Sequence, residues 1–200
     1  MSATPNRPLI IGPSSGPEPP YPLRMEGKVI SGFGRGSKEL GIPTANLPVD
    51  DSLQWIKDIK SGIYFGWASL GLPSSHPQHN SSSQTNGFQI YPMVMSIGYN
   101  PFYKNTVRSA EVHVLQNFGA DFYGVEMRLL ITGFIREEKD YAGLEALIAD
   151  INFDCEVAKR SLEREEWLAR EQKGGKLDCA WLVRPSEVNG EEEKKLEAKV

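Results

Sequence analysis

The sequence predicts a mainly β fold, an antiparallel barrel or sandwich, followed by one long helix. Five segments rich in β-branched and aromatic residues succeed one another at short spacing, as antiparallel strands do. After Asp140 the apolar residues instead recur with a period near 3.6, which is typical of an amphipathic helix. The two patterns together indicate one β domain with a C-terminal helix.

Turn-forming or polar residues separate the expected strands. These strands are "RMEGKVISG" from Arg24, "GIYFGWASL" from Gly62, "QIYPMVMSIGY" from Gln89, "SAEVHVLQNF" from Ser109 and "GVEMRLLITGFIR" from Gly124. Residues 72–88, between the second and third strands, are polar and low in complexity. We expect this insertion to be a mobile hairpin loop that the protein can do without.

The expected helix has an apolar face, which should close the barrel. Its residues are Leu144, Leu147, Ile148, Ile151, Cys155, Ala158 and Leu162. The opposite face carries Glu145, Asp150, Glu156, Lys159 and Arg160. Such a charged face usually contacts solvent, so we expect no further role for it.

Length and composition limit the classes of protein to consider. The 200 residues suffice for one domain, and a net charge of -4 provides no basic surface for nucleic acid. The two cysteines form neither a disulfide framework nor a zinc motif. Because no apolar run has the length of a signal peptide or a transmembrane segment, we expect a cytoplasmic protein. We divide the chain into an irregular, proline-rich arm (1–22), a folded domain (23–172) and a charged tail (173–200).

A glycine-rich loop, "GFGRGSK", begins at Gly32. Glycines allow backbone amides to approach phosphate oxygens, and a lysine supplies positive charge. A P-loop, however, needs glycine directly before the lysine and a helix after it, whereas here Ser37 precedes Lys38 and Pro43 prevents a helix. The spacing also differs from the glycine loops of protein kinases and Rossmann folds.

The "PTAN" segment that follows the loop brings two oxygen donors together. In an extended strand Thr44 and Asn46 project from one face, while Ala45 points to the other. A hydroxyl and an amide carbonyl suit a hydrated Mg²⁺ whose other ligands are phosphate and water. From the residues alone, a strand edge with two polar residues is the commoner explanation, because Thr and Asn near turns usually bond to the backbone.

Several separate blocks in the same order carry a resemblance to a known family. They are "GFGRGSKELGIPTANLP", "SGIYFGWASL", "MVMSIGYNPFYKN", "RSAEVHVLQNFGADFYG" and "LEALIADINFDCEVAKRSLE". Together they resemble the monofunctional riboflavin kinases of eukaryotes, from about Met25 to Arg170. The resemblance implies a six-stranded antiparallel Greek-key β-barrel with a C-terminal α-helix. It also implies transfer of the γ-phosphate of ATP to the ribityl 5′-hydroxyl of riboflavin, which gives FMN and ADP.

The same resemblance implies the roles of individual residues. Thr44 and Asn46 correspond to the ligands of the metal ion, Mg²⁺ or alternatively Zn²⁺. Glu111, in "RSAEVHVL", corresponds to the catalytic glutamate. The residues expected around ATP, in addition to Thr44 and Asn46, are Gly32, Gly34, Gly36, Ser37 and Lys38.

Strand alternation is compatible with a catalytic role for Glu111. Ala110 and Val112 would face the core, leaving Glu111 and His113 on the other side. Without the resemblance, Glu111 would be interpreted as an ordinary exposed strand residue. We expect His113 to be structural, because a lone histidine beside a site is more often hydrogen-bonded than catalytic.

Two other functions remain open from the residues alone. A barrel could bind flavin or nucleotide without catalysing transfer, although such a binder needs no metal ligands beside a phosphate loop. The aromatic residues permit an oligonucleotide-binding barrel, and the acidic net charge disfavours it. We expect a monomeric enzyme that binds riboflavin and ATP and no nucleic acid.

Overall fold

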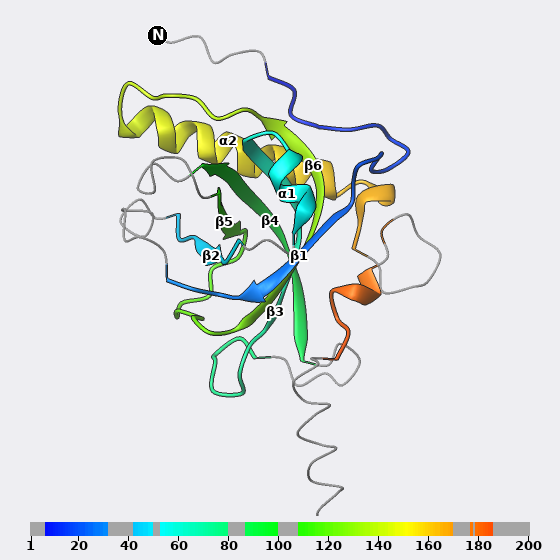
Figure 1. Cartoon of the computed structure of the whole chain (residues 1–200), viewed down its shortest axis with the longest axis vertical. Coiled ribbons are helices and arrows are strands. Elements are labelled where there is room, and N and C mark those ends of the chain that lie inside the picture. Colours follow the sequence, from blue (N-terminus) through cyan, green and yellow to red (C-terminus); the bar gives the residue numbers. More distant parts are fainter. Residues whose placement is uncertain are drawn as a thin grey trace, which may run out of the picture.

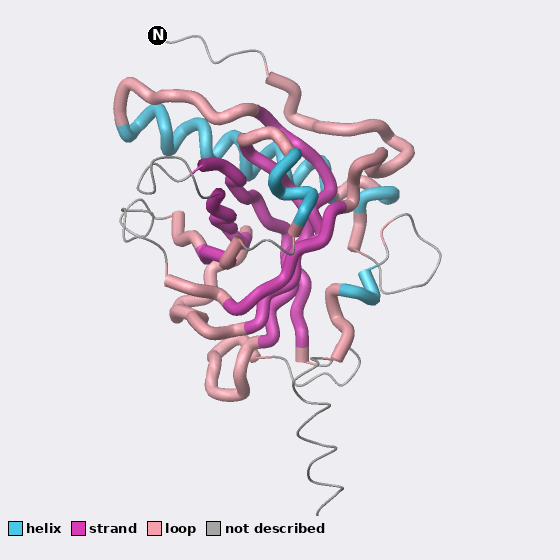
Figure 2. Tube along the Cα trace, in the orientation of Figure 1, coloured by secondary structure: helices cyan, strands magenta, loops and turns pink. Residues whose placement is uncertain are grey.

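The computed structural model describes residues 7–31, 42–49, 53–79, 87–99, 108–169, 177 and 179–185. In Figures 1 and 2 the strands gather at the centre and α2 lies alongside them. The elements are β1 (Leu23–Lys28), β2 (Ala45–Leu47), α1 (Gln54–Asp58), β3 (Gly62–Gly71), β4 (Phe88–Tyr99), β5 (Arg108–Val114), β6 (Glu126–Arg136), α2 (Leu144–Leu162) and the short 3-10 helices η3 (Glu165–Trp167) and η4 (Cys179–Trp181). The predicted mainly β class and the C-terminal helix are confirmed.

In the described part of the chain the six strands form one antiparallel sheet in the order β1-β6-β3-β4-β5-β2. β3, β4 and β5 follow one another across the sheet, and β6 returns to pair with β3, which is a Greek-key arrangement. The sheet curls until its two edges touch: the backbone N–H of Ile30, just after β1, donates to the carbonyl of Asn46 in β2 at 2.9 Å. The six-stranded Greek-key prediction is confirmed, as a curled sheet that one bridge closes.

Alternate strand residues fill the inside of this sheet. In β5, Ala110, Val112 and Val114 join the buried interior cluster, whereas Glu111 and His113 between them are partly exposed. Successive side chains of a strand point to opposite faces, so Glu111 and His113 lie on the outer face, as the sequence predicts.

The short helix α1 covers one end of the interior. Ile56 of α1 is 1% exposed and belongs to the interior cluster. The guanidinium of Arg108 in β5 donates to the carbonyls of Ile56 and Ile59, both at 2.7 Å, and to the hydroxyl of Ser61 at 3.0 Å. A buried arginine therefore satisfies the carbonyls at the end of α1, which have no partner within the helix.

The long helix α2 lies against the outer face of β3 and β4. Ala158 and Leu162 pack on Phe65 and Val94, while Met95 of the same sheet faces the interior. We expected this helix to close the barrel, and its observed place is different. The outward residues of β3 and β4 are themselves apolar, and α2 removes them from water.

The described C-terminal residues, 177 and 179–185, cover more of this outer face. Leu182 is fully buried and belongs to a cluster with Phe88 and Leu130. We expected these residues in a charged, solvated tail, because their few apolar side chains follow neither a helical nor a strand period. They pack where the outer face of the sheet would otherwise expose apolar side chains.

The described part of the N-terminal arm, residues 7–22, is docked on α2 and η3. The backbone N–H of Ile11 donates to the hydroxyl of Ser161 at 2.9 Å. The carbonyl of Pro13 accepts from Arg164 at 3.1 Å and from the indole N–H of Trp167 at 3.0 Å. The arm therefore belongs to the folded domain even though it has no helix or strand.

The first part of the 72–88 insertion is also tied to the barrel. His76 is 8% exposed and its ring lies 6.2 Å from that of Phe118. The side-chain amide of Gln78 donates to the carbonyl of Asn117 at 2.5 Å, and Gln89 donates to the carbonyl of Gln78 at 2.7 Å. These contacts differ from the expectation of a dispensable loop. Residues 80–86 lie outside the described ranges.

Candidate functional site

Three polar residues form a row across the outer face of β2, β5 and β4. Asn46 lies directly opposite Glu111, and Glu111 lies directly opposite Ser96. Directly opposite residues of antiparallel strands project from the same face, with Cβ atoms about 5 Å apart. The neighbouring Ala45 and Val112 belong to the interior cluster, so the row lies outside the barrel. The structure thus brings together Asn46 and Glu111, two of the predicted site residues.

Thr44, the third predicted site residue within the described ranges, lies between two cavities. The first, of about 590 Å³, lies between the outer face of the sheet and α2, and we call it the helix-side cavity. The second, of about 480 Å³, lies beside residues 116–123, and we call it the loop-side cavity. Thr44 lines both cavities, whereas Glu111 lines only the helix-side cavity. Both volumes are in the range of small-molecule sites in proteins.

The helix-side cavity has an apolar wall and a polar wall. Ile63 and Val94 from the sheet and Leu147 and Ile151 from α2 supply the apolar side. The polar side consists of Ser96, Glu111, His113, Arg136, Glu138, Lys139, Asp140, Tyr141 and Asp154, together with Thr44. An apolar slot with polar groups on one side suits a flat ring system that carries a hydroxylated chain.

The loop-side cavity is bounded by the aromatic turn that contains "FGADFYG". Phe118 is 8% exposed and packs edge-on against Tyr91 and Phe122, with ring centroids 5.2 and 4.8 Å apart. Phe118 therefore fixes the turn to the barrel. Tyr123, in contrast, is 54% exposed and lines the cavity, so its ring is accessible to a ligand.

His113 connects β5 to the residue before Thr44. Its Nδ1 lies 2.8 Å from the carbonyl of Pro43, and since a carbonyl can only accept, Nδ1 carries the proton. Burial lowers the pKa of His113, against the opposing effect of this hydrogen bond. A neutral His113 thus fixes the backbone that leads into Thr44, in accordance with the structural role that we expected.

A second carboxylate lies close to Glu111. The side chain of Glu138 covers Gly98 in β4 so closely that a Cβ there would come within 2.2 Å of a Glu138 oxygen. Burial raises the pKa of Glu138, Arg108 and Arg136 partly reverse this, and the charge of Glu111 raises it further. The absence of a side chain at Gly98 makes room for this second carboxylate.

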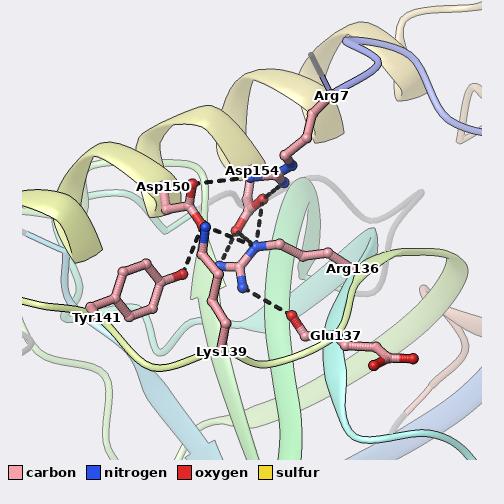
Figure 3. Close-up of polar contacts among 7 residues, drawn as sticks. All are labelled: Arg7, Arg136, Glu137, Lys139, Tyr141, Asp150 and Asp154. Carbon is pink, nitrogen blue, oxygen red and sulfur yellow. Dashed lines mark hydrogen bonds and ion pairs between the residues drawn. The ribbon is translucent and has the colours of Figure 1, made fainter. Parts of the chain in front are cut away.

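A charged cluster forms the far wall of the helix-side cavity (Figure 3). Arg136, at the end of β6, donates to both oxygens of Asp154 at 2.7 to 3.2 Å. Asp150, one turn earlier on α2, accepts from Lys139 at 2.7 Å and from Tyr141 at 2.8 Å. The side chains of Asp150 and Asp154 are only 13% and 1% exposed.

This cluster corrects one prediction and includes two residues that were not predicted from the sequence. Asp150 was expected on a solvated face, but it is paired and mostly buried. Asp154 and Arg136 were not singled out at all. The spacing of Asp150 and Asp154, four residues apart, places them side by side on the helix. That spacing was the available signal, but no pattern in the sequence shows that Arg136 approaches them.

The remaining predicted site residues, Gly32, Gly34, Gly36, Ser37 and Lys38, lie outside the described residues. Within the described ranges, no three His, Cys, Asp or Glu side chains come together so as to hold a metal ion. The predicted ligands are of a different kind, namely neutral oxygens from Thr44 and Asn46. None of the described helices has the length and apolar run needed to cross a bilayer.

Comparison with known proteins gives a consistent result. Residues 19–162 match a family described as Flavokinase, riboflavin kinase. The chain is 62% identical to the riboflavin kinase of Chaetomium globosum, with 92% of this chain and 96% of the relative covered. It is 60% identical to the riboflavin kinase of Neurospora crassa, with coverages of 90% and 97%. The crystal structure of riboflavin kinase from Trypanosoma brucei superposes with a TM-score of 0.57 at 26% identity, covering 74% of this chain and 83% of that one.

Proposed function

The chain belongs to the riboflavin kinase family and is a riboflavin kinase, and we propose that its two substrates meet at Thr44, with Glu111 as the general base. The reaction uses ATP and riboflavin and gives FMN and ADP. One observation supports this arrangement above all: Thr44 lines both cavities, whereas Glu111 lines only the helix-side cavity. A transferase for two small molecules needs two adjoining sites with the reacting atoms at their junction.

We assign riboflavin to the helix-side cavity. Its apolar wall, which includes Ile63 and Leu147, suits the isoalloxazine ring, and its polar wall suits the ribityl chain. The nucleotide then occupies the loop-side cavity, where the exposed ring of Tyr123 is available to a base. Under this assignment the ribityl 5′-hydroxyl reaches Glu111 from one side and the phosphates reach Thr44 from the other.

The residues at the junction fit a divalent metal ion. Thr44 and Asn46 offer neutral oxygen donors, which suit Mg²⁺ or alternatively Zn²⁺ when phosphate and water complete the shell. Asn46 is only 7% exposed, so its amide is held in a strand and does not move freely. A metal ion bound there would neutralise charge on the phosphates during transfer.

Glu111 accepts the proton of the ribityl 5′-hydroxyl in this proposal. The oxygen attacks the γ-phosphorus, a new P–O bond forms, and the bond from the γ-phosphorus to the bridging oxygen breaks so that ADP leaves. Because a primary alcohol attacks directly once it is positioned, no covalent phospho-enzyme is needed. Glu138 is the second carboxyl group beside Glu111, and both side chains line the helix-side cavity.

The glycine-rich loop and Lys38 would surround the phosphates, since backbone amides and a lysine bind oxyanions well. We further propose that the enzyme is a cytoplasmic monomer.

Incubation of the purified chain with riboflavin, ATP and Mg²⁺, followed by chromatography, tests the activity. We expect FMN and ADP in equal amounts. Binding of both ligands without FMN formation would contradict this expectation. To test the cavity assignment, Leu147→Trp should fill the helix-side cavity and weaken riboflavin binding while ATP binding remains within about twofold. The opposite pattern would exchange the two cavities.

A further inference from the structure

The N-terminal arm contributes one charged residue to the wall of the helix-side cavity. Arg7 reaches down onto α2 from the arm and donates to Asp150 at 3.2 Å and to Asp154 at a shorter distance (Figure 3). Its guanidinium also lies over the ring of Phe153 at 4.7 Å. The side chain of Arg7 is 17% exposed, so the contact is sheltered from solvent and less screened than a surface ion pair.

Asp154 is held between two guanidinium groups. Arg136 binds it from the sheet and Arg7 binds it from the arm, and both oxygens of Asp154 are used. A buried carboxylate in a charged cluster keeps its position only while its partners remain, because losing one removes a charge-assisted hydrogen bond that water does not replace. Asp154 and Arg136 both line the helix-side cavity, so a shift of either residue changes the shape of the cavity.

Asp150 connects Arg7 to the loop after β6 through its contacts with Lys139 and Tyr141. One oxygen of Asp150 accepts from Arg7, and the other accepts from Lys139 and Tyr141, which also line the cavity. Although burial acts in the opposite direction, hydrogen bonds from Lys139 and Tyr141 hold the pKa of Asp150 below its ordinary value. The carboxylate is therefore charged at neutral pH and joins the arm, α2 and the cavity loop.

The charge balance of this cluster depends on the arm. Arg136, Lys139 and Arg7 supply three positive charges against the two carboxylates of Asp150 and Asp154. Without Arg7 the remaining cations are just sufficient to neutralise the carboxylates. Arg136 and Lys139 would then be drawn toward α2 and away from the cavity, because each carboxylate has lost a partner.

We propose that Arg7 is a positioning residue of the kinase. It fixes Asp150 and Asp154, and through them it holds the polar wall of the helix-side cavity in the geometry that riboflavin needs. This inference rests on the proposed assignment of the helix-side cavity to riboflavin. Arg7 does not line either cavity. It acts through the side chains that do.

If the arm only stabilised the fold, any variant that weakens its docking would lower the Tm without a specific effect on riboflavin binding. The hydrogen bond from Ile11 to Ser161 also fastens the arm to α2, but Ser161 lines neither cavity. Ser161→Ala is therefore the matched control, since it weakens the docking of the arm and leaves the charged cluster intact. Arg7→Lys keeps the charge but offers one nitrogen in place of the fork that reaches two carboxylates.

The test uses the full chain and measures three quantities: the Tm, the KM values for riboflavin and for ATP, and riboflavin binding by the quenching of its own fluorescence. We expect Arg7→Ala to raise the riboflavin KM and Kd on the order of tenfold, with the ATP KM within about twofold. Arg7→Lys should be intermediate. Ser161→Ala should lower the Tm by about 2–4 °C, as Arg7→Ala also does, with unchanged riboflavin binding.

Two outcomes would overturn the inference. In the first, Arg7→Ala lowers the Tm while riboflavin KM and Kd stay within twofold of the unmodified protein. In the second, Ser161→Ala weakens riboflavin binding as strongly as Arg7→Ala, which would assign the effect to arm docking and not to the charged cluster. A failure of the proposed function is distinguishable, because it appears in the unmodified chain as absent FMN formation, while the fluorescence measurement still compares the variants.

Discussion

Asn46 of β2 and Glu111 of β5 face each other across one antiparallel pair, although β3 and β4 lie between them in the chain. The pairing places a proposed metal ligand beside the proposed general base. Thr44, two residues before Asn46, lines both cavities. The short strand β2 therefore determines where phosphate and acceptor hydroxyl would come together.

Replacing Glu111 by Gln tests the general base. Because the amide cannot take the proton of the ribityl hydroxyl, we expect turnover to fall about a hundredfold or more, while riboflavin binding is retained. Steady-state FMN formation and fluorescence titration with riboflavin measure the two effects. Glu137→Gln is the matched control, because that side chain is 71% exposed and should tolerate the same change. Near-normal turnover of Glu111→Gln would remove this residue from the mechanism.

Asn46→Ala tests the proposed metal site by binding alone. If Asn46 holds a metal ion that also contacts phosphate, the variant should bind Mg²⁺-ATP far more weakly, with little change for metal-free ADP. Lys38→Ala should weaken both nucleotides with or without metal, since its attraction for phosphate does not need the ion. Calorimetric titration with ATP and ADP, with and without Mg²⁺, separates the two cases. Unchanged binding of all four combinations by Asn46→Ala would restore the interpretation of "PTAN" as a polar strand edge.

The two parts of the insertion between β3 and β4, residues 74–79 and 81–85, should differ in how well they tolerate replacement. Replacing residues 74–79 by glycine and serine of equal length removes the contacts of His76 and Gln78 with residues 116–118. We expect a lower Tm and a higher KM for ATP, because residues 116–118 line the loop-side cavity. The same replacement at residues 81–85 is the control, and its polar, low-complexity sequence predicts little effect. Equal tolerance of both replacements would contradict this division.

Tyr141 should make the protein less stable as the pH rises into the alkaline range. Burial and its hydrogen bond to Asp150 raise the pKa of Tyr141 from 10.0 to about 12. Between these two values the unfolded chain ionises this tyrosine while the folded chain does not, so stability is lost as the pH rises. Tyr141→Phe should show a shallower loss of stability over this range. Denaturant unfolding at a series of pH values measures the slope, and equal slopes for both proteins would disprove the expectation.

The sequence predicted the fold through patterns that act locally. Alternation in residues 109–114 placed Glu111 on the outer face, and the structure agrees. The same reasoning could not place α2, because an apolar helical face reports only that something covers it. Leu182 likewise gave no periodic signal, and its burial became visible only through its contact with Phe88.

What the sequence by itself determined is the family, the order of strands and helix, and the residues Thr44, Asn46 and Glu111 as candidates. Each of these depends on residue types at fixed spacing along the chain. Only the tertiary structure decided that Asn46 lies opposite Glu111, that Thr44 separates two cavities, and that Arg7 reaches Asp154. The physical reason is that strand register and ion pairing join residues far apart in the chain. Their geometry follows from how the sheet curls and where α2 packs, which no local pattern encodes.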